Sequence, residues 1–150
     1  MTPLSKLDVP RADGSQGLAR SVMEDNLSRL EPEHTATVTP DTPVRDVVEK
    51  MKSARSGCAL VLENGKLVGI FTEHDVLHRV FGANAIGLQA PVRELMSPNP
   101  EALRETDSVA TALNKMSLGR YRHIPVARND GSFTITSIRS VLKYISQEDW

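Results

Sequence analysis

The chain has 150 residues, of which 39% are hydrophobic and 25% charged, and its formal net charge is −1. This length suits one domain or two small ones packed together, and it excludes a separate catalytic domain beside a regulatory one. The near-neutral charge argues against a general polyanion binder. The single cysteine, Cys58, excludes an internal disulfide and favours a reducing compartment. Because the sequence lacks a bilayer-length apolar run and a secretory signal, we expect a soluble, cytoplasmic protein.

Residues 1–26 are predicted to form an N-terminal extension that is flexible at first and helical later. Residues 1–16 contain prolines and polar residues without periodicity. From Leu18 to Leu30, apolar residues recur at helical spacing, which favours an amphipathic helix. Such a helix either covers its own domain or contacts another subunit, and the sequence favours neither.

Residues 27–90 and 91–150 are predicted to be two copies of one structural unit. When the chain is shifted by 65 positions, ten residues match without a gap, and most of them are apolar. Examples are Leu30 with Leu95, Met51 with Met116, Val61 with Val126 and Leu77 with Leu142. Each copy alone buries little apolar surface, so the two should pack on each other.

The first copy begins with a predicted strand at 35–38, followed by a helix for which Thr42-Pro43 provides the N-cap and the first residue. A buried strand at 58–62 and a second strand at 67–71 are joined by Asn64-Gly65, a strong hairpin signal. A helix at 73–81 ends the unit.

The second copy repeats this order. Asp107 is predicted to cap its first helix, whose apolar face begins at Val109, and strands are predicted at 102–104, 124–126 and 133–136. The final helix covers 138–145. Both units are therefore predicted to be β-α-β-β-α, and the fold class is α+β, with two repeats packed pseudo-symmetrically after the helical extension.

One segment of the first copy carries residues suited to nucleotide chemistry. Thr72 can cap the helix after the strand, whose first N–H groups favour an anion nearby, and Gly69 allows close approach to the strand. Asp75, three residues after Thr72, can accept both hydroxyl groups of a ribose. The same Thr-x-x-Asp pattern also occurs at ordinary helix starts, so both interpretations stay open at this point.

Three segments together resemble the motifs of the CBS family, arranged as the tandem pair called a Bateman module. They are Gly69-Ile-Phe-Thr-Glu-His-Asp75, Tyr121-Arg-His-Ile-Pro-Val126 and Val38-Thr-Pro-Asp-Thr-Pro-Val44, and the resemblance covers about residues 27–146. It implies a sensor module without catalytic machinery that binds AMP, ADP, ATP or S-adenosylmethionine in clefts between the repeats. It also implies a homodimer and a regulated protein partner. It implies no required cofactor, and it leaves open whether magnesium accompanies the bound nucleotide.

The resemblance assigns residues to two clefts. The first cleft would contain Ile70, Thr72, His74, Asp75, Arg122, His123 and Ile124. The second would contain Val38, Gly57, Cys58, Ser137 and Ser140. Ser140 occupies the position equivalent to Asp75 and is too short to accept both ribose hydroxyls. We therefore expect one competent site per chain, with the second cleft degenerate.

Parts of the sequence are also compatible with other functions. A CBS-scaffold interaction protein with no competent ligand site is favoured by the missing aspartate at position 140 and opposed by the intact first motif. The sequence shows no set of nucleophile, base and orienting group, so we do not expect an enzyme. His74 and His78 lack the pattern of a zinc site. Only Tyr121 accompanies the basic residues of the second half, so nucleic acid is not an expected partner.

Overall fold

A computed structural model describes residues 15–81, 87–119 and 121–147 of the chain. The elements, in chain order, are α2 (Ser15–Glu24), η1 (Leu27–Arg29), β1 (Ala36–Val38), α3 (Val44–Ala54), β2 (Cys58–Glu63), β3 (Lys66–Thr72), α4 (Glu73–Asp75), η2 (Val76–Val80), η3 (Val92–Glu94), β4 (Ser97–Pro98), β5 (Leu103–Arg104), α5 (Val109–Gly119), β6 (His123–Ala127), β7 (Phe133–Ser137) and α6 (Ile138–Gln147). No helix in these ranges has the length and apolar character needed to cross a membrane.

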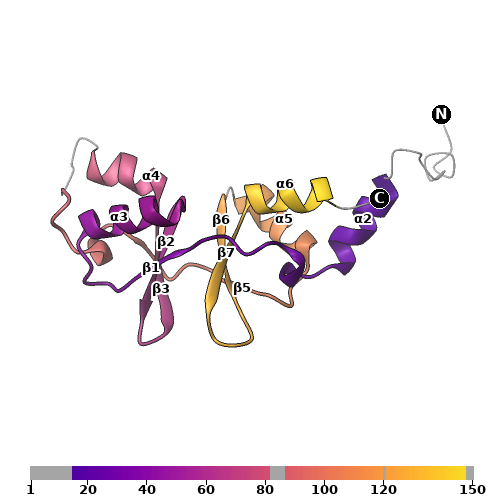
Figure 1. Cartoon of the computed structure of the whole chain (residues 1–150), viewed down its shortest axis with the longest axis horizontal. Helices are drawn as coiled ribbons and strands as arrows, with labels where there is room; N and C mark the ends of the chain where they lie inside the picture. Colours follow the sequence, from indigo (N-terminus) through magenta and orange to yellow (C-terminus); the bar gives the residue numbers. More distant parts are fainter. Residues whose placement is uncertain (1–14, 82–86, 120, 148–150) are drawn as a thin grey trace.

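The strands form two sheets that lie side by side (Figure 1). The first has the order β1-β2-β3-β4, and the second has the order β5-β6-β7. In each sheet the first strand is parallel to its neighbour and the next two strands are antiparallel. Helices α3 and α4 accompany the first sheet, and α5 and α6 accompany the second. The predicted α+β class and the β-α-β-β-α order of both repeats are confirmed.

Each repeat buries its own core, as the matching apolar positions predicted. In the first, Val44, Val47 and Met51 of α3 pack in one cluster with Val61 and Phe71 of the sheet. The second core contains the equivalent helix positions on α5, which are Val109, Ala112 and Met116. A third cluster joins the repeats, because Leu60 and Ile70 of the first sheet pack with Ile135 of the second.

The hairpin between β2 and β3 has the predicted tight turn. Asn64 and Gly65 both have positive φ angles, 52° and 79°. Two consecutive left-handed residues match the twist of the flanking strands, which is why Asn-Gly is favoured in such turns.

Two helix caps differ from the predictions. Helix α3 begins at Val44 with Pro43 in the cap position, and the Thr42 hydroxyl accepts a hydrogen bond from the Thr39 N–H at 3.2 Å instead. At the start of α5, the Ser108 Oγ accepts a hydrogen bond from the Thr111 N–H at 3.1 Å. Asp107 instead closes the preceding turn, because its Oδ2 accepts from the N–H of Arg104 at 2.8 Å.

The predicted helix at 18–30 is divided in the structure. Helix α2 ends at Glu24, and the Asn26 side chain accepts from the Ser28 N–H at 3.1 Å to start η1. Leu27 and Leu30 are buried in the core of the second repeat, and the Leu27 N–H donates to the Asp107 carbonyl at 2.9 Å. This segment therefore covers its own chain, and the division of the sequence at residues 26 and 90 stays a prediction.

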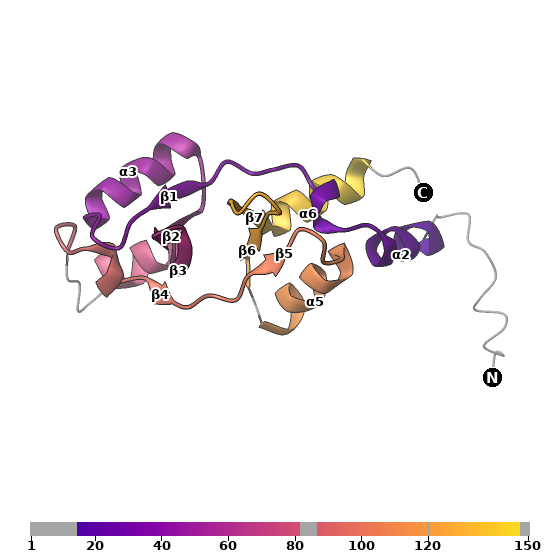
Figure 2. The same cartoon turned by 90° about the horizontal axis from the view of Figure 1, so that it is seen from below.

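The chain thus passes from the second repeat to the first and back again. We call residues 31–35, which lead from η1 to β1, the N-terminal strap, and residues 96–102, which lead from η3 to β5, the central strap. Figure 2 shows both crossing between the two halves of the molecule. The central strap contains β4, a short strand that pairs with β3 and that is absent from the predicted elements.

Candidate ligand-binding clefts

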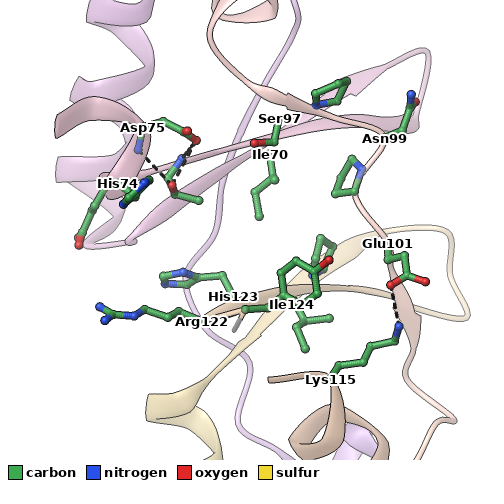
Figure 3. Close-up of a pocket in the computed structure, with 16 residues that line it drawn as sticks. Ile70, His74, Asp75, Ser97, Asn99, Glu101, Lys115, Arg122, His123 and Ile124 are labelled. Atoms are coloured by element: carbon green, nitrogen blue, oxygen red, sulfur yellow. Dashed lines mark hydrogen bonds and ion pairs between the residues drawn. The ribbon is translucent and has the colours of Figure 1, made fainter. Parts of the chain in front are cut away.

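The first cleft is a cavity of about 740 Å³ between the repeats. One wall comes from the end of β3, α4 and the central strap, and the other from the start of β6 and from α5 (Figure 3). All the residues that the resemblance assigns to this cleft line the cavity: Ile70, Thr72, His74, Asp75, Arg122, His123 and Ile124. The fold brings them together, and their role in binding stays a prediction.

Asp75 is held in a fixed orientation by a capping box at the start of α4. Its Oδ2 accepts hydrogen bonds from the Thr72 N–H at 2.9 Å and from the Thr72 hydroxyl at 3.2 Å. Thr72 Oγ1 in turn accepts from the Asp75 N–H at 3.3 Å. The second carboxylate oxygen, Oδ1, lies 3.6 Å from Nε of Arg79. This buried carboxylate is thus oriented and has a cation beside it.

The middle of the first cleft is apolar. Ile70 from β3 and Ile124 from β6 are buried, and both line the cavity, one from each repeat (Figure 3). Two aliphatic side chains from opposite repeats suit the two faces of a flat aromatic ring. Figure 3 places Asp75 near one end of this apolar section and Glu101 with Lys115 at the other.

His123 is uncharged near neutral pH. Burial lowers its pKa below the usual 6.5, and the nearby Arg122 lowers it further, while the charges of Glu33 and Glu73 oppose the shift. Arg122 is therefore the side chain that brings positive charge to this part of the cleft. His123 contributes a neutral imidazole.

Gly57, in the first repeat, makes room for that imidazole. A Cβ atom at this position would lie 2.8 Å from Nε2 of His123, closer than side chains normally approach. Gly69 makes room for Met96 on the central strap in the same way, because a Cβ atom added at Gly69 would lie 2.2 Å from Sδ of Met96. The close approach expected at Gly69 is therefore made by the chain's own methionine.

Sequence reasoning missed the far end of the first cleft. There, Nζ of Lys115 lies 2.7 Å from Oε2 of Glu101, and Ser97 and Asn99 complete the wall. These residues come from α5 and the central strap, outside any recognised motif. Of these residues, Lys115 matches Lys50 in the repeat register, but that match does not indicate a binding role.

His74 does not belong to a metal site in the described residues. Its ring stacks on that of His78 with centroids 4.1 Å apart and a tilt of 44°. Among residues 15–81, 87–119 and 121–147, no three His, Cys, Asp or Glu side chains gather as metal ligands would.

The second cleft is a larger cavity of about 820 Å³ on the other side of His123. Gly57, Ser137 and Ser140 line it, as the resemblance implies. The two other residues assigned to it, Val38 and Cys58, are buried in hydrophobic clusters and are not part of its lining. The two cavities share Glu73, Arg122 and His123, which form the wall between them.

Cys58 has the environment of a structural thiol. Burial, followed by the negative charges of Glu33 and Glu73, raises its pKa to about 12. A thiol that stays protonated at neutral pH is a poor nucleophile. This agrees with the place of Cys58 in the cluster that joins the repeats.

Comparison with known proteins gives a consistent result. The model of the CBS domain matches residues 19–82 and 92–146. The CBS domain-containing protein CBSCBSPB5 of Arabidopsis thaliana is 35% identical over 116 residues, which cover 76% of this chain and only 21% of that protein. Our chain therefore spans about a fifth of that relative.

Solved structures show the same fold. A CBS-domain containing protein from Agrobacterium tumefaciens is 30% identical, with a TM-score of 0.66 over 75% of this chain and 90% of that one. The structure of CBSX2 in complex with AMP has a TM-score of 0.70 at 20% identity, over 82% of this chain and 97% of that one, and so shows likeness of fold alone.

Proposed function

Because the chain belongs to the CBS-domain family and carries two copies of the domain, we propose that it is a non-catalytic regulatory module that binds an adenosine-containing ligand in its first cleft. One observation carries this proposal. A single cavity brings together the buried carboxylate of Asp75, one buried isoleucine from each repeat and the guanidinium of Arg122. A sugar diol, a flat base and a phosphate are the three parts of a nucleotide that such groups recognise.

Each residue has a role in this proposal. Asp75 accepts hydrogen bonds from the ribose hydroxyls, and Ile70 and Ile124 contact the two faces of adenine. Arg122 pairs with the phosphates by charge-assisted hydrogen bonds, and His123 adds a neutral donor. The AMP bound in the structurally similar CBSX2 supports the ligand class. AMP, ADP, ATP and S-adenosylmethionine are the candidates, and no cofactor is needed.

The regulatory step follows from the position of the cleft between the repeats. A ligand that contacts both repeats favours the relative orientation that it fits best, by its difference in affinity for the alternatives. We propose that a homodimer in the cytoplasm carries this change to a protein partner. If neither cleft binds a ligand, the chain is instead an interaction scaffold, and the following experiment separates the two.

The test is a thermal-shift panel of the purified chain with AMP, ADP, ATP and S-adenosylmethionine, each with and without magnesium. A ligand at 100 times its dissociation constant adds about 2.7 kcal/mol to the free energy of unfolding, or about 5–10 °C for a domain of this size. Asp75→Asn keeps an oxygen for the cap and removes the charge, so we expect it to lose the shift. Asp41→Asn, on an exposed loop, is the matched control.

Two outcomes would contradict the proposal. The first is an equal shift in the wild-type protein and in Asp75→Asn, which would place the ligand elsewhere. The second is the absence of any shift across the panel, which would favour the scaffold. A shift retained in Asp41→Asn and lost in Asp75→Asn would identify both the ligand and its site.

A further inference from the structure

In both repeats, the hydroxyl of the last residue of the second hairpin strand donates a hydrogen bond to a carboxylate. At the end of β3, Thr72 Oγ1 donates to Oδ2 of Asp75 at 3.2 Å. At the end of β7, Ser137 Oγ donates to Oε1 of Glu33 at 2.8 Å. The carboxylate absent from position 140 is therefore replaced, at the same hydroxyl, by one from a distant segment.

Glu33 lies on the N-terminal strap, which lines the second cleft as the central strap lines the first. The strap residues correspond in the register of the repeat, because Pro98 follows Glu33 by the same 65 positions. The two clefts are thus reciprocal. In the first cleft, the motif supplies Asp75, and the central strap has Pro98 at the matching position. In the second cleft, the motif position holds Ser140, and the N-terminal strap supplies Glu33.

Glu33 is not needed for the helix cap at this position. Ser140 Oγ accepts from the Ser137 N–H and donates to the Ser137 carbonyl, both at 2.9 Å, so this serine already completes the start of α6. The second carboxylate oxygen of Glu33, Oε2, is buried and has no hydrogen-bond partner among the described residues. A buried acceptor without a donor is costly, and a ligand hydroxyl in the cleft would remove that cost.

The rest of the second cleft suits an anionic group. Arg55 from the end of α3 lines the cavity together with Arg139 and Lys143 of α6, and Lys143 is ion-paired with Glu31 of the N-terminal strap. Arg122, in the shared wall, also faces it. Guanidinium groups bind phosphates with paired, charge-assisted hydrogen bonds. An acceptor for hydroxyls and a group of cations therefore occupy one cavity.

We propose that the second cleft is a binding site for a nucleoside phosphate and that Glu33 is its sugar-binding carboxylate. This inference takes the class of ligand from the proposed function and rests on it. It replaces the expectation of one competent binding site per chain with two binding sites per chain. The cavity volume of about 820 Å³ exceeds that of the first cleft.

The test measures the number of AMP and ATP molecules bound per chain by isothermal titration calorimetry. We compare the wild-type protein with Glu33→Gln, Asp75→Asn and the double variant. Gln retains an oxygen that can accept from Ser137 and loses the charge, so the strap should keep its place. Glu49→Gln, on the exposed face of α3 and outside both clefts, is the matched control.

We expect two binding events per chain in the wild-type protein and in the control. Loss of hydrogen bonds to a charged acceptor should weaken one event by about tenfold or more in Glu33→Gln and leave the other unchanged. Asp75→Asn should weaken the other event, and the double variant should lose both. A single event in the wild type that is lost in Glu33→Gln and kept in Asp75→Asn would support this inference while refuting the proposed function.

Three results would overturn the inference. In the first, the wild type binds one nucleotide per chain, which Asp75→Asn abolishes and Glu33→Gln does not change; the proposed function then stands alone. In the second, Glu33→Gln binds more tightly, which would make Glu33 a plug of the second cleft. In the third, neither nucleotide binds, and both proposals fail.

Discussion

His123 links the stability of the folded chain to solution pH. Its pKa is lowered in the folded state, mainly by burial, so the unfolded chain binds a proton more readily than the folded one. The groups that surround it are Glu33 from the N-terminal strap, Glu73 from α4 and its neighbour Arg122. Protonation of His123 therefore opposes folding.

The expected result is a loss of stability at acidic pH. The contribution of His123 should be complete above the unfolded pKa of about 6.5 and should decline as the pH falls below it. The free energy of unfolding, measured with urea at pH 7.5 and 5.5, should therefore fall less in His123→Gln than in the wild type. Exposed His34→Gln is the control, and an identical decline in all three proteins would contradict this view.

Contacts between residues were predictable where the sequence places the partners close together. Thr72 and Asp75 form their predicted contact because three residues separate them on one helix start. Glu33 was missed because Ser137, its hydrogen-bond partner, lies 104 positions along the chain. Gly57 was expected to line a cleft, which it does, but its second role of accommodating His123 depends on the packing of two repeats.

At the scale of elements, the segment that contains Leu27 and Leu30, at the start of the predicted first repeat, is part of the second repeat's core. Leu30 is buried there, and it corresponds in register to Leu95, which is buried in the first core. We expect Leu30→Ala to lower the free energy of unfolding by about 2–5 kcal/mol, because it leaves a cavity. Urea denaturation measures this value.

The control for this prediction lies on the neighbouring helix. Met23 on α2 is 69% exposed, so Met23→Ala should change the free energy of unfolding by less than about 0.5 kcal/mol. If Leu30→Ala were equally mild, the segment would not be an integral part of the core.

The order of elements was predictable because one apolar pattern occurs twice in one register. The helix faces at Val44 and Val109 and the hairpin turns appear as expected. Strand β4 was not predictable, since it has two residues and one is Pro98, and it exists only by pairing with β3. The break between α2 and η1 depends on the Asn26 side chain, which competes with the helix for the backbone N–H of Ser28.

At the scale of the whole molecule, equivalent helices of the two repeats present exposed apolar side chains. Leu77 on η2 and Leu142 on α6 are 64% and 60% exposed, and they match in the repeat register. Phe81 and Ile138, near them in sequence, are exposed as well. Figure 1 shows α4, which η2 continues, and α6 on the same side of the two sheets. Such apolar groups are typical of a protein–protein contact.

We expect this surface to hold the proposed homodimer together. The double variant Leu77→Glu with Leu142→Glu should convert a dimer into a monomer, because it places charges in an apolar contact. Light scattering after gel filtration measures the mass, which is 16.5 kDa for one chain. Leu118→Glu, which changes an exposed residue of α5, should leave the dimer intact. A dimer that survives the double variant would place its interface elsewhere.

The crossing of the chain from the second repeat to the first and back has a consequence for synthesis on the ribosome. The core of the first repeat is drawn from residues 36–95, so it can close as soon as they emerge. Leu27 emerges from the ribosome earlier than this core. Its N–H binds the carbonyl of Asp107, which is synthesised 80 residues later. At about 5–20 residues per second, the nascent chain must keep Leu27 and Leu30 from other partners for roughly 4–16 s.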